Sequence, residues 1–299
     1  MKIGIVGGGA IGLTFAAALA TVHDVIVLEA DREIVDVVRR SGIAVVESEE
    51  TEFVPVRATL DPRELADREA ILVAVKAYAT HAALVPLAAV AAPNALFASI
   101  QNGLDNDVAA RSALPRARIA LGVTTHGALS LGPGRLRPGG RGMTTFARDR
   151  ATYPTSDDLA AAFAQAGLEA EAVDDIAPVL WSKLIVNAAI NPLAALARRT
   201  NGAIVDDPDL AQLARAVTAE AAAIAAAEGI PLPDAWARVE GTARATAENR
   251  NSMLQDLEAG RPTEIDAIGG ALLARAAVHG IAVPLTGAMV ALIRVGARG

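Results

Sequence analysis

Three features of the sequence predict an α/β domain with a doubly wound parallel sheet, followed by an all-α domain. Up to residue 173, short apolar runs typical of buried strands alternate with helical segments. A glycine-rich turn follows the first of these runs directly, and strand signals stop near Asp174. The sequence therefore predicts one domain over residues 1–173 and a second, helical domain over residues 174–299.

The first strand is followed by a glycine motif in the run KIGIVGGGAIGLTFAAALA. Gly7, Gly9 and Gly12 have GxGxxG spacing between an expected strand and an expected helix, and a second strand, DVIVLE, comes next. In this context Gly7 permits a tight turn, Gly9 lets the backbone approach a pyrophosphate, and Gly12 lets helix and strand pack closely. The anion would lie at the helix amino terminus, beside the amides of Ala10 and Ile11. We therefore expect a dinucleotide-binding domain of the Rossmann type, with a plain glycine-rich turn as the alternative.

Two charged residues after the second strand bear on the choice of dinucleotide. Glu29 lies where an acidic side chain accepts the adenosine ribose hydroxyls and rejects a 2′-phosphate, which favours NAD. The alternative is an ordinary surface carboxylate, and Arg32 could instead reach a 2′-phosphate. The cofactor is therefore expected to be NAD or NADP, with Glu29 favouring NAD.

Two more polar residues follow strands of the first domain. Lys76 comes directly after the run AILVAV, and Asn102 follows ALFASI in the sequence QNG. Ligands of open α/β folds bind at the carboxyl ends of such strands, so both are candidate ligand contacts. The alternatives are a solvated loop lysine and an asparagine in an ordinary NG turn.

The remaining elements are expected from pattern alone. The first domain should contain helices over 33–40, from about 77 to 90 and over 157–166, and hairpins over 43–56 and 124–149. The second domain should contain helices over 176–196, 208–228, 233–258, 262–279 and 284–295.

Lysine is scarce in this chain. Only three of the 27 basic residues are lysines, namely Lys2, Lys76 and Lys183. Arginine stays protonated at all accessible pH values, so proton transfer near neutral pH requires lysine rather than arginine. Because Lys2 has a simple structural position at the start of the first strand, Lys76 and Lys183 are the lysines that need a chemical explanation.

The run WSKLIVNAAINP places three polar side chains on one stripe of a helix. Lys183, Asn187 and Asn191 are four residues apart and fall within about 80° of arc. Aliphatic residues occupy most of the remaining circumference, which predicts a mostly buried helix. The stripe is a candidate catalytic site, and the alternative is a lysine that reaches solvent beside two asparagines with satisfied amides.

A second polar run in the helical domain is NRNSMLQDLEAGRPTEID. It contains two candidate site residues, Ser252 and Glu264. Each also has a structural interpretation, because Ser252 with Gln255 fits a capping box and Glu264 fits the first turn of a helix.

Composition excludes several classes of function. The net charge of −7 and the 3% aromatic content argue against nucleic-acid binding, and no apolar run reaches the roughly 18 residues of a membrane span. The absence of cysteine excludes disulfides and thiolate chemistry, the four histidines show no ligand spacing, and no metal site is expected. Met1 leads directly into the first strand without a targeting segment, which predicts a cytoplasmic protein.

The chain resembles the ketopantoate reductases (2-dehydropantoate 2-reductases). The segments that match, in chain order, are GGGAIG, VKAY, QNG, WSKLIVNAAINP and NSMLQDLEAGRPTEID. The last two are the specific ones, since the glycine motif is shared by many dehydrogenases, and the resemblance covers nearly the whole chain. Many relatives carry arginine after the second strand to bind the NADP phosphate, where this chain has Glu29 and Asp31.

The resemblance implies a Rossmann domain that binds the nicotinamide cofactor and a helical domain that binds the substrate. It implies that Lys183 is the catalytic lysine and that Glu264 acts beside it. Asn187, Asn191 and Ser252 would hold the hydroxyl and carboxylate of the substrate, and Lys76 and Asn102 would contact the cofactor, with Asn102 also near the substrate. The reaction would be reduction of ketopantoate to pantoate, in pantothenate and coenzyme A biosynthesis, by a monomer or by a homodimer formed through the helical domain.

Three alternatives remain. A related reductase could act on another bulky 2-oxo acid such as phenylglyoxylate, as in D-mandelate dehydrogenase. A dinucleotide-binding regulator without catalysis would be expected to lack the lysine or an asparagine of the stripe. A dehydrogenase that uses His126 as its acid would need a carboxylate partner, which the sequence does not identify. Burial should lower the pKa of Lys183 and the charge of Glu264 should raise it, and the sequence leaves the balance open.

Overall fold

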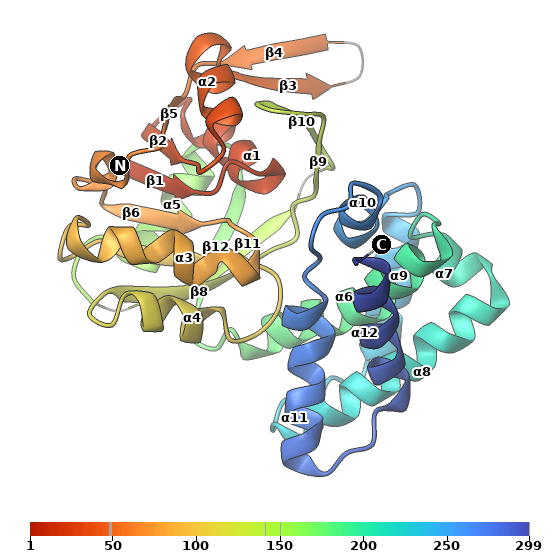
Figure 1. Cartoon of the computed structure of the whole chain (residues 1–299). Coiled ribbons are helices and arrows are strands. Elements are labelled where there is room, and N and C mark those ends of the chain that lie inside the picture. The colour runs from red at the N-terminus through yellow and green to blue at the C-terminus, as the bar shows by residue number, and fades with distance from the viewer. Residues whose placement is uncertain (48–49, 141, 150, 299) are drawn as a thin grey trace. The chain divides into compact units, whose positions relative to one another are not determined.

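The computed structural model describes residues 1–47, 50–140, 142–149 and 151–298 (Figure 1). The chain forms two compact units. Unit 1 contains Met1–Gln101 and Asn106–Ile176, and unit 2 contains Ala177–Gly299 together with Asn102–Asp105. This short insertion is important below, because it carries Asn102 into the helical unit.

Unit 1 is built on an eight-stranded sheet in the order β12-β11-β8-β7-β6-β1-β2-β5. The six strands from β5 to β8 are parallel, and the strand order reverses between β1 and β6, as in dinucleotide-binding folds. The bounds are β1 Lys2–Val6, β2 Asp24–Leu28, β5 Arg57–Thr59, β6 Ala70–Val73, β7 Leu96–Ser99, β8 Arg118–Thr124, β11 Met143–Ala147 and β12 Glu169–Val173.

The helices of unit 1 follow local capping signals. Asp31 caps α2 (Arg32–Ser41) by accepting from the amide of Glu33, and Thr155 and Asp158 form a capping box on α5 (Ser156–Gln165). The other α-helices are α1 (Ala10–Leu19), α3 (Thr80–Leu84) and α4 (Asn106–Ala113), and η1 (Pro62–Leu65) is a 3-10 turn.

One helix expected in unit 1 is shorter than predicted. In place of a continuous helix to residue 90, only α3 is α-helical, between the 3-10 turns η2 (Ala77–Ala79) and η3 (Val85–Ala89). Pro86 explains the break, because it has no backbone N–H to continue the α-helical ladder.

A second sheet of four strands has the order β4-β3-β10-β9. β3 (Ile43–Glu47) and β4 (Glu50–Val54) are antiparallel, as predicted for this segment, whose residues 48 and 49 lie outside the described residues. The long hairpin predicted over residues 124–149 is confirmed. Its inner part is the antiparallel pair β9 (Ala128–Ser130) and β10 (Arg135–Pro138), and its two ends pair where Thr124 of β8 lies opposite Thr144 of β11 in the large sheet.

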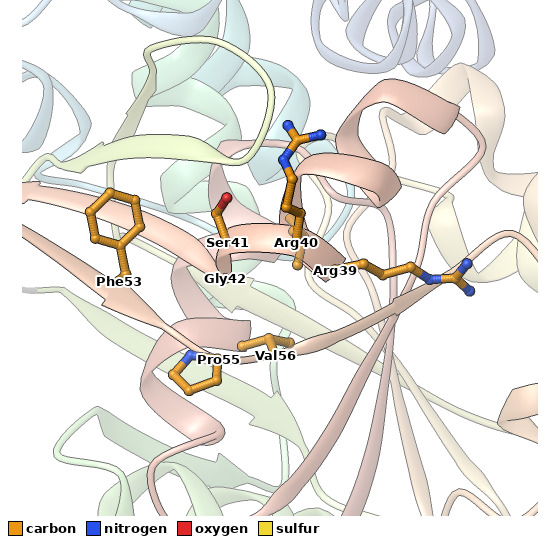
Figure 2. Close-up of a pocket in the computed structure, with 8 residues that line it drawn as sticks. Arg39, Arg40, Ser41, Gly42, Phe53, Pro55 and Val56 are labelled. Carbon is orange, nitrogen blue, oxygen red and sulfur yellow. The ribbon is translucent and has the colours of Figure 1, made fainter.

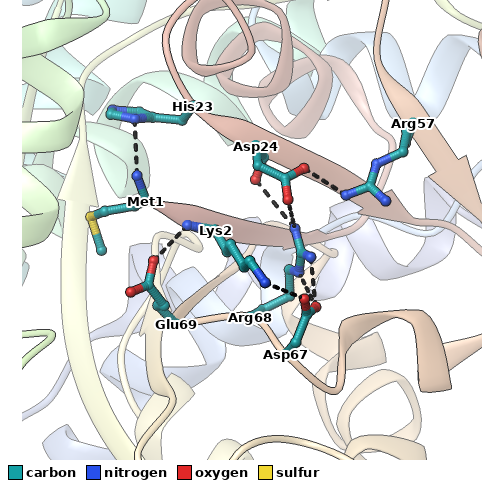
Figure 3. Close-up of polar contacts among 8 residues, drawn as sticks. All are labelled: Met1, Lys2, His23, Asp24, Arg57, Asp67, Arg68 and Glu69. Carbon is teal, nitrogen blue, oxygen red and sulfur yellow. Dashed lines mark hydrogen bonds and ion pairs between the residues drawn. The ribbon is translucent and has the colours of Figure 1, made fainter.

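A charged network closes the amino-terminal edge of the large sheet (Figure 3). Arg68, which is 3% exposed, donates to Asp24 at 3.0 Å and to Asp67 at 2.6 Å. Lys2 reaches Asp67 at 2.8 Å, which supports the simple structural position expected for this lysine. Asp67 has its pKa lowered to about 2 because Lys2 and Arg68 donate hydrogen bonds to its carboxylate.

Unit 2 consists of helices packed around α6 (Ala177–Ala197). The other helices are α7 (Ala203–Asp206), α8 (Pro208–Ala227), α9 (Ala235–Ala245), α10 (Ser252–Glu258), the π-helix η4 (Asp266–Gly270), α11 (Ala271–His279) and α12 (Pro284–Gly296). The helix predicted over 233–258 is two helices, α9 and α10. The one predicted over 262–279 begins later, as η4 followed by α11.

Among the described residues, α6 and α8 have the length and apolar composition of a membrane span. Within unit 2, however, 61% of the apolar window of α6 and 33% of that of α8 are buried. A helix at the centre of a packed core has the same composition, so these two helices are weak grounds for a membrane assignment.

Candidate functional site

The glycine loop of unit 1 has the geometry that a dinucleotide site requires. Gly7 has φ +111, and an added Cβ would lie 2.8 Å from the amide nitrogen of Val75. A Cβ on Gly12 would lie 1.9 Å from the carbonyl oxygen of Gly7, so helix and turn touch there. At Gly9 nothing lies within 4 Å of an added Cβ, which leaves room for a bound group at the amino terminus of α1.

Glu29 binds the loop directly. Its Oε2 accepts from the amide of Gly8 at 2.5 Å, and its Oε1 accepts from Ala30 at 2.7 Å and from Asp31 at 2.9 Å. A carboxylate thus holds three backbone donors at the end of β2, where an adenosine ribose lies in this fold. Arg32 is exposed in the first turn of α2.

Lys76 lies in the loop after β6, across the strand-order reversal from the glycine loop. Buried Gln101 fixes this loop, because its Nε2 donates to the carbonyl oxygen of Val75 at 2.7 Å and to Oγ1 of Thr80 at 2.7 Å. Gln101 was not among the predicted site residues. Its position in the run QNG, directly before Asn102, was the only available signal.

In unit 2, α6 carries Lys183, Asn187 and Asn191 along one side, as the four-residue spacing requires. Asn191 is 7% exposed. Over the described ranges, the side chains of Asn187 and Asn191 form no hydrogen bond, so both amides are available to a ligand. The helix continues through Pro192, which has no N–H to offer the carbonyl of Ala188, and tertiary packing compensates for that loss.

Burial decides the protonation of Lys183. It lowers the pKa of the ammonium to about 8, and the charge of Glu264 acts in the opposite direction. The sequence did not decide whether burial or the charge of Glu264 has the larger effect on this pKa, and in the structure burial has the larger effect. A lysine that titrates near 8 can donate a proton at neutral pH, which arginine cannot.

Glu264 is 7% exposed and lies before η4. Its Oε2 accepts a hydrogen bond of 3.0 Å from Nδ2 of Asn102. Glu264 therefore precedes the helix instead of lying in its first turn, and its carboxylate contacts a side chain from a distant segment. Unit 2 brings together Lys183, Glu264 and Asn102, three residues that are far apart in the sequence.

Ser252 begins α10, but it does not form the capping box with Gln255 that was its structural alternative. Asn251 caps this helix by accepting from the amide of Leu254 at 3.0 Å, and Gln255 donates instead to the carbonyl of Arg250. Asn251 also donates to Asn201 at 3.2 Å. Asn201 was not predicted to contribute, although it accepts a hydrogen bond from the residue that caps the helix carrying Ser252.

His126 lies against Phe15, with ring centroids 5.4 Å apart at 81°. Burial lowers its pKa, although Glu169 acts against the shift. Its Nε2 is buried without a hydrogen-bond partner in the described chain. In the described chain no carboxylate forms a hydrogen bond with this imidazole Nε2 to orient the ring for proton transfer.

Unit 1 also has a hollow of about 280 Å³ (Figure 2). It is lined by the last turn of α2 and by the end of β4 with the residues that follow it, including Arg39, Arg40, Ser41 and Phe53. None of the predicted site residues lines it.

A Rossmann-type unit with an open glycine loop, together with a helical unit that holds a lysine titrating near 8, defines a nicotinamide-dependent oxidoreductase. Models of ketopantoate reductase match the two parts of the chain, the PanE/ApbA model over residues 3–150 and the PanE/ApbA C-terminal model over residues 175–297. The chain belongs to the ketopantoate reductase family.

Relatives and solved structures agree with this assignment. The 2-dehydropantoate 2-reductase of Halobacterium salinarum is 34% identical over 100% of this chain and 99% of its own, and that of Archaeoglobus fulgidus is 34% identical over 98% and 97%. A PanE/ApbA family ketopantoate reductase from Ralstonia eutropha superposes with a TM-score of 0.91 at 32% identity, covering 100% of this chain and 99% of that chain. D-mandelate dehydrogenase with NADH and anilino(oxo)acetate has a TM-score of 0.92 at 23% identity, with the same coverage, which shows a shared fold.

Proposed function

We propose that this protein reduces ketopantoate to pantoate, with Lys183 as the general acid. The observation that carries the proposal is the pKa of Lys183, which burial lowers to about 8 on a helix whose stripe also presents two asparagine amides. Such an ammonium is protonated at neutral pH and can release its proton within the reaction. We expect the enzyme to act in the cytoplasm.

The dinucleotide, when bound, supplies the hydride that reaches the carbonyl carbon. Negative charge then develops on the carbonyl oxygen, and the Lys183 ammonium stabilises that charge and donates its proton there. Glu264 holds Lys183 closer to its charged form, since its carboxylate raises the pKa that burial lowers. Turnover returns the proton to Lys183 from solvent.

Substrate binding in this proposal falls to amide and hydroxyl groups. Asn187 and Asn191 would hold the hydroxyl and carboxylate of the substrate, together with Ser252 at the start of α10. Asn102, held by Glu264, would contact cofactor and substrate. Amides suit this task because each offers both a donor and an acceptor.

For the cofactor, Glu29 supports NAD. Its carboxylate occupies the amides of Gly8, Ala30 and Asp31, so a 2′-phosphate would meet negative charge there instead of free donors. Many members of the family bind the NADP phosphate with an arginine after the second strand, where this chain has Glu29. The basic residue closest to Glu29 in the sequence is Arg32. The cofactor site would be completed by residues of the glycine loop and the start of α1, namely Gly7, Gly9, Ala10, Ile11 and Gly12, and by Lys76 in the loop after β6.

The test is the initial rate of ketopantoate reduction with NADH and with NADPH, with phenylglyoxylate as a second substrate. Fast turnover of ketopantoate, with NADH preferred, is the expected result. If only phenylglyoxylate were reduced, Lys183 would still be the proposed acid, but the proposed substrate would be an aromatic 2-oxo acid instead of ketopantoate. Failure with both acids and both cofactors would contradict the proposal.

A further inference from the structure

The segment of residues 102–105 leaves the large-sheet unit and packs with the helices of unit 2. The chain enters it after buried Gln101 and returns to unit 1 at α4. Two of its residues have positive φ, Gly103 at +92 and Asp105 at +64. A non-glycine residue in that region needs a compensating interaction, although aspartate tolerates it better than most.

Arg275 on α11 supplies that interaction. Its Nη1 donates to Oδ2 of Asp105 at 2.9 Å and its Nη2 donates to Oδ1 at 2.6 Å, a two-point contact between guanidinium and carboxylate. Nη1 also lies 3.4 Å from the carbonyl oxygen of Ala271, one turn earlier on α11. Because the guanidinium is planar and donates from two nitrogen atoms to both carboxylate oxygens, it fixes the orientation of the Asp105 side chain as well as its distance.

The same guanidinium lies near the helix that carries the catalytic lysine. Its Cζ is 6.0 Å from the ring centroid of Trp181, which precedes Lys183 by two residues on α6. Arg275 is 21% exposed, and Nε is 3.9 Å from Glu228 at the end of α8. One side chain therefore contacts α6, α8, α11 and the 102–105 segment.

Backbone packing holds the middle of the segment. The amide of Leu104 donates to the carbonyl oxygen of Ala267 in η4 at 3.4 Å. A Cβ on Gly103 would lie 2.3 Å from that same oxygen, so only glycine permits the approach. Glu264, which accepts from Asn102, lies three residues before Ala267. The two ends of the segment are thus held by Glu264 and by Arg275.

We propose that Arg275 is a positioning residue for the reaction, which acts by holding Asp105 and thereby keeping Asn102 against Glu264. The proposal rests on the roles of Asn102 and Glu264 in the proposed function. Arg275 itself touches neither substrate nor cofactor in this role. A shift of about 1 Å in a positioned group can lower the reaction rate on the order of 100-fold. The loss of a remote ion pair can therefore slow the chemical step.

The test compares Arg275→Met, Arg275→Lys and the control Arg244→Met. Methionine keeps an apolar stem beside Trp181 but removes the ion pair, and lysine restores one of two contacts. Arg244 pairs with Glu240 at 2.9 Å on the surface of α9, so its variant removes a comparable ion pair elsewhere in unit 2. Hydrogen exchange of the peptide containing Leu104, the side-chain amide signal of Asn102 by NMR, kcat and KM are measured for each.

For Arg275→Met we expect about tenfold faster exchange at Leu104, a displaced Asn102 amide signal, and kcat/KM lower by roughly 10- to 100-fold, mostly in kcat. Arg275→Lys should recover part of each change, and Arg244→Met should match the wild type. Asp105→Asn should reproduce the loss, and adding it to Arg275→Met should cost nothing further, because both act through one contact.

Wild-type exchange at Leu104 and an unmoved Asn102 signal in Arg275→Met would overturn the proposal, as would a displaced segment with unchanged kcat. If the wild-type protein reduced neither 2-oxo acid, the proposed function would fail by itself. The Asn102 signal would then still show whether Arg275 holds Asn102 against Glu264.

Discussion

Glu264 raises the pKa of Lys183 against a larger effect of burial, which lowers it to about 8. The two residues are 81 positions apart in the sequence and belong to different elements, α6 and the turn before η4. A carboxylate beside a buried ammonium keeps the acid charged at neutral pH, while burial keeps its proton available. This relationship leads to the first two predictions.

Replacement of Lys183 by alanine should lower kcat by about 10²- to 10⁴-fold, the contribution typical of a positioned proton donor. Lys183→Arg should be similarly inactive, since guanidinium keeps its proton. Dinucleotide binding, followed by nucleotide fluorescence, should remain, because the glycine loop belongs to unit 1. Lys2→Ala serves as the matched control, and wild-type turnover in Lys183→Ala would exclude the lysine as acid.

The reduction should slow as the pH rises through about 8. The acid must be protonated to act, and its pKa is lowered to about 8, so kcat/KM should be highest below that pH and fall above it. Glu264→Gln removes the charge that raises this pKa, so the descending limb should move to lower pH. Glu248→Gln, an exposed change, is the control. A limb that stays in place in Glu264→Gln would show that Glu264 does not act on Lys183.

Neutralising Glu29 should shift the cofactor preference. Glutamine retains one acceptor for the amides of Gly8, Ala30 and Asp31 but removes the charge that opposes a 2′-phosphate. We expect the NADPH/NADH ratio of kcat/KM to rise on the order of tenfold, equivalent to about 1.4 kcal/mol. Glu33→Gln, in the first turn of α2, controls for a general loss of negative charge. An unchanged ratio would show that Glu29 does not select the cofactor.

Two glycines of the loop should respond differently to alanine. Gly12→Ala places a Cβ 1.9 Å from the carbonyl oxygen of Gly7 and should destabilise the fold by about 3 kcal/mol in urea unfolding. Gly9→Ala meets no atom within 4 Å, so its stability should stay near that of the wild type. Its Cβ would enter the space expected for the pyrophosphate, weakening dinucleotide binding on the order of tenfold. Unimpaired binding by Gly9→Ala would place the pyrophosphate elsewhere.

Arg68→Met should destabilise the protein by about 1 to 2 kcal/mol at neutral pH, a value reduced for the solvent exposure of both aspartates. The pKa of Asp67 is lowered from its ordinary 3.8 to about 2 by Lys2 and Arg68. The stability linked to it is therefore present above pH 3.8 and lost as the pH falls towards 2. Urea unfolding at pH 7 and pH 3 should show the difference between wild type and variant shrinking. Arg63→Met, which breaks an exposed pair with Asp61, is the control.

The sequence pattern alone predicted the bounds of several helices and strands. β1 begins at Lys2 and ends directly before the glycine turn, as predicted. The bounds of α6 and α8 lie within one residue of the predicted ranges, because strong apolar periodicity and proline or glycine residues at their ends define them. The break of the predicted helix at Pro86 and the split between α9 and α10 were missed. In both places local helical preference was overridden by a missing N–H or by a competing cap, Asn251.

The sequence by itself determined the glycine loop, the scarcity of lysine and the four-residue spacing of the stripe on α6, because these depend on neighbours within one element. Only the tertiary structure decided that Asn102 joins the helical unit, that Arg275 holds Asp105, and that burial lowers the pKa of Lys183 despite Glu264. Such relationships depend on which distant residues pack together and on how much water they exclude. Neither can be predicted from the spacing of residues within one element.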